Sequence, residues 1–175
     1  MMHELPMNKS GIIDPHLNKS ELVERRICPL IELDETKDIP LGRLVRYWFS
    51  LPRPHGVLPD IDQIGLMDLT RLGVLGWFHV IGVNDENPLN YRYDVHAMRT
   101  VGGHTGIRIG EVGSNALRQA LEQDYSLAKL NRFPLFQTIR TDLRSHTREY
   151  RRVTLPLASG TDDVTHLLVG VHFDD

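Results

Sequence analysis

The sequence predicts an α+β fold built on one antiparallel sheet of five strands with flanking helices. Strand-like segments fall in two blocks, residues 75–98 and 133–173, and a helical segment separates them. Parallel neighbours need a crossover connection after each strand, so two blocks of hairpins exclude a parallel α/β sheet. A length of 175 residues suits one domain that buries a sizeable core without disulfides or metal.

The first 38 residues are polar and weakly patterned, and we interpret them as a partly ordered N-terminal arm. One short helix is expected in this arm, over Glu21–Cys28, because apolar residues recur there at helical spacing and Pro29 ends the segment. The domain itself is expected to cover residues 39–175.

A clearer helix is predicted over residues 39–51. Its apolar residues recur at positions that share one helical face: Leu41, Leu44, Val45 and Trp48. Pro40 suits the first turn of this helix, and Pro52 forbids its continuation.

The period then changes from helical to strand-like. The run "LGWFHVIGV" (residues 75–83) is apolar and of strand length, and "YRYDVHAM" (residues 91–98) alternates between apolar and polar side chains. Turn-forming residues separate the two runs, which therefore predict an antiparallel hairpin.

The longest interior helix is expected over residues 114–130, with Ser114 as its N-cap. Three strands follow, over residues 133–143, 148–157 and 163–173. In the last strand, one face is apolar and is expected to point inward: Thr165, Leu167, Val169, Val171 and Phe173. His166, Gly170 and His172 then point the other way.

The order and spacing of several short sequence motifs in this chain resemble those of a bacterial family of small, mostly stand-alone PAS proteins. The matching motifs are "YW-x-x-L" (Tyr47, Trp48, Leu51), "LPDID" (residues 58–62), Tyr91-Arg92-Tyr93, "TG-x-x-x-x-EV" (residues 105–112), "YRRVTLPLASG" (residues 150–160) and "VTHLLVGV" (residues 164–171). Residues 94–97 depart from the family pattern, because they lack the glycine found there in relatives. The resemblance covers residues 39–173.

The resemblance implies a PAS-like sheet with a cavity between its concave face and the helices. It also implies a sensory or regulatory domain that binds a small molecule or a signalling protein and acts by non-covalent contact. We expect a homodimer that pairs through the arm and the helix at Leu41–Phe49. A ligand-free module that docks a signalling protein on its outer sheet face is the alternative. No cofactor follows from the sequence.

The predicted faces select nine candidate cavity residues. They are apolar or aromatic residues on the expected inner side: Trp77, Tyr91, Tyr93, Leu117, Leu121, Tyr125, Phe136, Leu155 and Val169. Aromatic and apolar linings are typical of small-molecule sites, but the same residues could simply fill the core.

The sequence offers little for covalent or metal chemistry. The single cysteine, Cys28, lies ahead of the predicted domain, which disfavours a photosensor that needs a reactive cysteine within it. The helix over residues 114–130 contains no histidine, which disfavours haem. No nucleophile and base are paired, so a catalytic site is not predicted. An isomerase or dehydratase on a similar curved sheet remains the less favoured alternative.

Four histidines fall on predicted strands: His79, His96, His166 and His172. In the usual PAS strand order the first strand lies between the second and the fifth. His96 and His172 could then approach His79 and form a metal site. The favoured interpretation places His96, His166 and His172 on the outer face, because no carboxylate or cysteine stands at matched spacing.

Residues 140–152 contain five arginines but only two acidic residues, and Tyr150 lies among the arginines: Arg140, Arg144, Arg148, Arg151 and Arg152. They could bind an anionic partner or ligand, although such a run is more often the solvated face of a hairpin. The formal net charge of −3 and a pI near 6.3 disfavour nucleic acid and anionic lipid as partners. The chain carries no secretory or membrane-spanning pattern, so a cytoplasmic protein is expected.

Overall fold

The computed structural model describes residues 21–96, 105–143 and 146–173. Its sheet has six strands in the order β1-β4-β5-β6-β2-β3, and all neighbours are antiparallel. The strands are β1 (Leu22–Cys28), β2 (Phe78–Gly82), β3 (Arg92–Val95), β4 (Leu135–Leu143), β5 (His146–Leu157) and β6 (His166–Phe173). The helices are α1 (Ile39–Ser50), α2 (Leu66–Arg71) and α3 (Asn115–Asn131).

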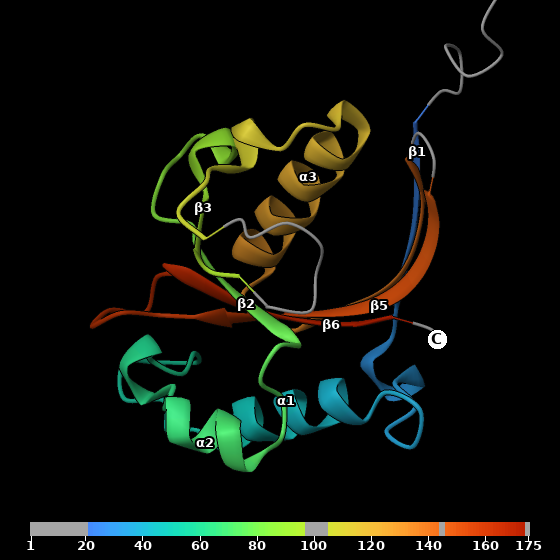
Figure 1. Cartoon of the computed structure of the whole chain (residues 1–175). Coiled ribbons are helices and arrows are strands. Elements are labelled where there is room, and N and C mark those ends of the chain that lie inside the picture. Colours follow the sequence, from blue (N-terminus) through green and yellow to red (C-terminus); the bar gives the residue numbers. More distant parts are fainter. Residues whose placement is uncertain (1–20, 97–104, 144–145, 174–175) are drawn as a thin grey trace, which may run out of the picture.

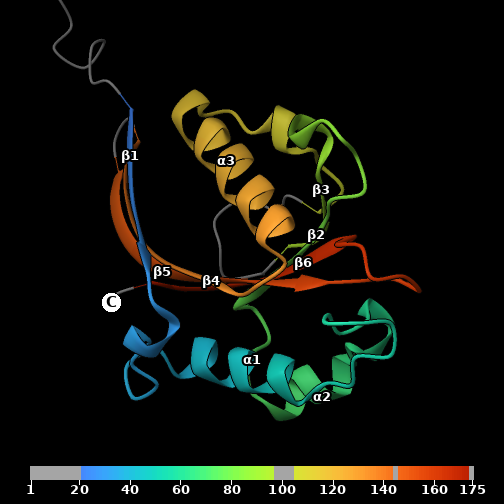
Figure 2. The same cartoon turned by 180° about the vertical axis from the view of Figure 1, so that it is seen from behind.

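The sheet lies between two helical layers. Helices α1 and α2 cover one face, and α3 crosses the other (Figures 1 and 2). The predicted α+β class and the antiparallel sheet are therefore confirmed. Helices α1 and α3 and the five predicted strands also lie close to their expected positions.

The predicted helix over Glu21–Cys28 is wrong, because this segment is the sixth strand. Strand β1 pairs along its whole length with β4, from Leu22 opposite Asp142 to Cys28 opposite Phe136. A helix of this length is marginal on its own, whereas the free edge of β4 offers a partner for every residue of the strand. The pairing partner lies more than 100 residues away along the chain and could not be seen locally.

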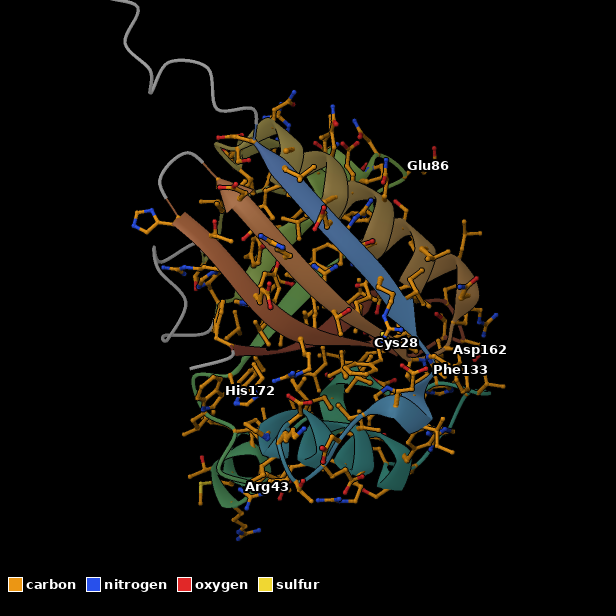
Figure 3. All side chains as sticks on the ribbon, turned by 90° about the vertical axis from the view of Figure 1, so that its right-hand side faces the viewer. Cys28, Arg43, Glu86, Phe133, Asp162 and His172 are labelled. Carbon is orange, nitrogen blue, oxygen red and sulfur yellow. The ribbon has the colours of Figure 1, made fainter. Side chains whose placement is uncertain are left out.

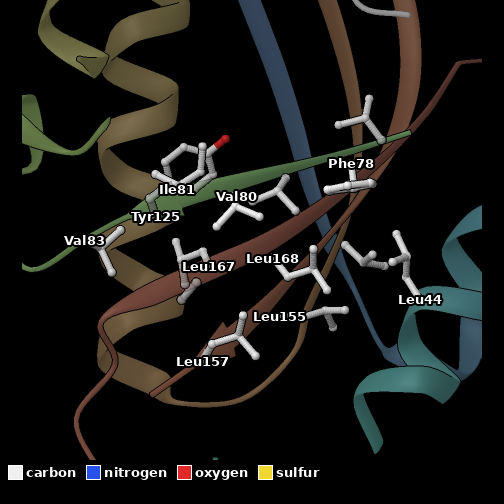
Figure 4. Packing of buried hydrophobic residues seen from close by; sticks show 14 of the residues in the cluster. Leu44, Phe78, Val80, Ile81, Val83, Tyr125, Leu155, Leu157, Leu167 and Leu168 are labelled. Atoms are coloured by element: carbon white, nitrogen blue, oxygen red, sulfur yellow. The ribbon is translucent and has the colours of Figure 1, made fainter. Parts of the chain in front are cut away.

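Helix α1 packs its apolar stripe onto the sheet. Leu41 and Leu44 are completely buried, and Trp48 donates its indole N–H to the carbonyl oxygen of Pro156 at 2.8 Å. A Cβ atom placed on Gly170 of β6 would lie only 2.7 Å from Leu44, so the helix rests directly on the strand. Figure 4 shows Leu44 directed at the sheet. This apolar stripe is therefore buried within the chain, and the homodimer expected to form through the arm and this helix stays a prediction.

Both faces of β6 are consequently buried. Val169 pairs with Thr154 of β5 and His79 of β2 on the α3 side of the sheet. Gly170 pairs with Val153 and Phe78 on the α1 side. The predicted alternation of β6 is correct, but the face that was expected to point outward is covered by α1.

None of the helices in the described part of the chain combines the length and the apolar content needed to span a membrane.

Candidate functional site

The candidate site is a pocket of about 180 Å³ between α3 and the sheet. It is lined by aliphatic and aromatic side chains together with a few basic and hydroxyl groups: His79, Tyr93, His96, Leu117, Leu121, Tyr125, Thr141, Leu143, Arg148, Tyr150, Arg152, Val171 and Phe173. Mostly apolar walls with a few convergent polar groups are the usual features of a small-molecule site.

Larger hollows elsewhere in the described structure are weaker candidates, as two of them show. One, of about 430 Å³, lies over β1, β4 and β5 and is lined mainly by charged side chains such as Glu24, Arg26 and Arg140. The other, of about 350 Å³, is an apolar groove between α2 and the end of β3. Neither brings aromatic walls and polar groups together as the pocket beneath α3 does.

Strand β5 supplies the polar wall of the pocket. Arg148, Tyr150 and Arg152 are spaced by two residues, so they lie on the same face of the strand. Arg148 is exposed, Tyr150 is half-buried and Arg152 is only 3% exposed. The row therefore runs from the solvent into the interior beneath α3.

Arg152 is held at the inner end of this row by a buried polar cluster. Its Nη2 atom donates to Gln137 Oε1 at 2.7 Å and forms an ion pair with Asp124 of α3. Asp124 also accepts a hydrogen bond from Arg25 Nη1 of β1 at 2.7 Å. One buried carboxylate thus lies between two guanidinium groups.

Helix α3 is fixed in this position from its first turn. Ser114 accepts a hydrogen bond from the Leu117 N–H at 3.2 Å, as the predicted N-cap should. The Ser114 hydroxyl also donates to Glu21, next to β1. These contacts orient the helix so that Leu117 and Leu121 face the pocket.

Three tyrosines contribute phenol groups to the pocket. The hydroxyl groups of Tyr93 and Tyr125 are hydrogen-bonded to each other, and the Arg152 guanidinium lies 5.5 Å from the centre of the Tyr125 ring. Burial raises the pKa of Tyr93 well above its usual value, and it also raises the pKa values of Tyr125 and Tyr150. All three phenols are protonated at neutral pH, as ordinary phenols are, and can donate hydrogen bonds.

A histidine pair closes another side of the pocket. The rings of His79 and His96 have centroids 4.4 Å apart, and both rings contact Tyr93. His79 thus does meet His96, as the metal-site hypothesis required. The placement of His96 on the outer face is wrong: it follows the end of β3 and lines the pocket beside Tyr93, because an irregular register between Val80 and Ile81 interrupts the alternation of β3.

The other two strand histidines lie on the α1 side of the sheet. Figure 3 shows His172 on this side, where Nδ1 lies 2.9 Å from Asp38 Oδ1 and the ring contacts Trp77. His166 lies 3.7 Å from Asp94. Within residues 21–96, 105–143 and 146–173, no group of three or more histidine, cysteine or acidic side chains is arranged to hold a metal ion.

The nine candidate cavity residues separate into three groups. Tyr93, Leu117, Leu121 and Tyr125 line the pocket. Tyr91 and Val169 are buried in the core without lining the pocket. Trp77, Phe136 and Leu155 lie on the α1 side of the sheet.

The prediction that Trp77, Phe136 and Leu155 line the cavity is therefore wrong. In register, Phe136 stands opposite Val153 and Leu155 stands opposite Leu168, and both pairs share the face that α1 covers. The pleat reverses at every residue, so apolar character alone does not assign a face when both faces are buried.

The arginine run divides in the same way. Arg148 and Arg152 line the pocket, whereas Arg140 and Arg151 lie on the opposite face. Arg144 is outside the described residues. The spacing Arg148-x-Tyr150-x-Arg152 was the available signal for the polar wall, whereas nothing local pointed to Asp124 as its counterion.

No family model matches this chain, and no curated protein or solved structure matches it either.

Proposed function

We propose that this chain is a PAS-type sensory or regulatory domain. In this proposal it binds a small molecule in the pocket beneath α3 and signals by non-covalent contact with a partner protein.

The strand order supports the PAS assignment. Strand β2 lies between β3, its hairpin partner, and β6, the last strand of the chain. This is the arrangement that the sequence resemblance implied. Strand β1 adds to the outer edge of β4 and leaves that order unchanged.

The observation that carries the ligand-binding proposal is the pocket itself. A docking module without a ligand would be expected to fill this space with side chains, as close-packed interiors normally do. Instead, a space of about 180 Å³ separates the leucines of α3 that face the pocket from Tyr150 and Phe173 of the sheet.

The enzymatic alternative gains no comparable support. An isomerase or dehydratase would need a carboxylate–histidine pair that faces the bound substrate. The described lining contains His79 and His96 but no acidic side chain. The neighbouring carboxylate, Asp124, is occupied by two arginines.

Native mass spectrometry of the purified chain, together with an absorption spectrum, tests ligand binding. We expect a non-covalent adduct in the wild type. Leu117→Trp should abolish it by filling the pocket, whereas Leu130→Trp should not, because Leu130 lies on the same helix but is 79% exposed. Absence of an adduct, and of binding by any anionic, neutral or cationic probe, would favour the docking module instead.

A further inference from the structure

The size, charge and hydrogen-bonding groups of the pocket restrict the chemistry of its occupant. We infer that the ligand is a small organic anion, with a body about the size of one six-membered ring and a carboxylate or similar group bound by Arg148 and Tyr150. This inference rests on the proposed ligand-binding function.

The volume limits the body of the ligand. Sites for drug-sized molecules occupy roughly 300–1,000 Å³, whereas an apolar cavity of about 150 Å³ is sufficient for benzene. A pocket of about 180 Å³ therefore has room for one ring, or a carbon skeleton of similar size, and one small polar group. Leu117, Leu121 and Phe173 provide apolar walls for that body.

The charge around the pocket is unbalanced. No carboxylate belongs to the described lining, and Asp124 alone faces the guanidinium groups of Arg25 and Arg152. A surplus positive charge in this partly enclosed site favours an anion and disfavours a cation.

Arg148 is the group best placed to bind that anion. In the described part of the chain it has no ion-pair partner, and its guanidinium lies 5.8 Å from the centre of the Phe173 ring at the solvent side of the pocket. Because Arg152 is already committed to Asp124 and Gln137, Arg148 is the guanidinium available for a bidentate contact.

Tyr150 supplies the second contact. Its side chain lies on the same face of β5 as that of Arg148, two residues further along the strand toward the buried Arg152. Its hydroxyl has no hydrogen-bond partner among the described residues. A phenol is protonated at neutral pH, and burial raises the pKa of Tyr150 further, so its hydroxyl can donate to an anionic oxygen.

Binding of three probes of similar size to the full-length chain tests this inference. Benzoate, benzamide and benzylamine have the same ring and differ mainly in charge. Saturation-transfer NMR detects binding of each probe, and isothermal titration calorimetry gives its affinity. We expect benzoate to bind at least about tenfold more tightly than benzamide, as one charge-assisted contact allows. Benzylamine should bind more weakly than either.

Variants of exposed arginines locate the contact. Arg148→Gln should remove the preference for benzoate, and Arg148→Lys should retain part of it. Arg140→Gln is the matched control, because it removes the same charge from the opposite face of the same hairpin. Tyr150→Phe should weaken benzoate binding by a few-fold to tenfold and leave benzamide nearly unchanged.

Each outcome decides between the two proposals. If benzamide or benzylamine binds as tightly as benzoate, and Leu117→Trp still blocks binding, the inference of an anion is wrong while the ligand-binding function stands. The same holds if Arg148→Gln retains the full preference. If no probe binds and the purified chain carries no adduct, both proposals are wrong.

Discussion

Loss of the Asp124 carboxylate should destabilise this fold more than loss of any ordinary surface charge. Asp124 is 4% exposed and Arg152 is 3% exposed, and the two form an ion pair beneath α3. The substitution Asp124→Asn keeps the size of the side chain but leaves the guanidinium of Arg152 buried without a counterion. Breaking a buried pair from one side typically costs about 3–5 kcal/mol.

Urea unfolding followed by circular dichroism measures the loss of unfolding free energy, and thermal unfolding measures the fall in melting temperature. In a domain of 150–250 residues, each kcal/mol moves the melting temperature by about 2–4 °C, so a decrease of about 6–20 °C is expected. Glu122→Gln is the matched control: it lies on the same helix, is only partly buried and forms no ion pair in the described structure. It should cost no more than about 0.5 kcal/mol.

A double-mutant cycle separates the charge from the shape of the side chain. In an Arg152→Met background, no buried guanidinium remains at that position, so Asp124→Asn should cost at least about 2 kcal/mol less than it does in the wild type. A loss below about 1 kcal/mol for Asp124→Asn alone would refute the reasoning. Equal losses in the two backgrounds would refute it as well.

Three further outcomes follow from the packing and burial of single groups. Gly170→Ala should cost about 1–3 kcal/mol in urea unfolding, because its Cβ would meet Leu44, whereas Gly113→Ala should be nearly neutral because no atom lies within 4 Å of its Cβ. Trp48→Phe should cost about 1–3 kcal/mol by the same assay, since it leaves the buried carbonyl oxygen of Pro156 without its donor. Burial raises the pKa of all five tyrosines, so an absorbance titration of the folded chain should show little ionisation near pH 10. The unfolded chain releases these protons near pH 10 and the folded chain does not, so unfolding free energy should be unaffected by these groups below that pH and should fall above it.

Local patterns in the sequence were sufficient to predict most elements. The helical spacing of Leu41, Leu44 and Trp48 predicted α1, and the apolar face within residues 163–173 predicted β6. These signals are local, because a helix or strand buries one side chain every three to four residues or every second residue. Ser114 likewise marked the start of α3, since its side chain caps the helix within a single turn.

The same patterns could not assign faces in a sheet covered on both sides. Phe136 and Leu155 were expected in the cavity but lie under α1, because alternation shows which residues share a face and not which helix covers it. The motif "TG-x-x-x-x-EV" (residues 105–112) contains two glycines, Gly106 and Gly110. Gly106 adopts a positive φ of 87°, which suits a turn, but neither Gly106 nor Gly110 lines the pocket.

The sequence by itself determined the α+β class, the positions of α1, α3 and the five strands from β2 to β6, and, outside β3, which residues share a face of a strand. Only the tertiary structure decided that β1 is a strand, that α1 packs on the sheet within the same chain, and that Asp124 neutralises Arg152. Each of these depends on contacts between segments that are distant along the chain. Local periodicity carries no information about such partners, so only the assembled sheet and helices could place the charged wall of the pocket.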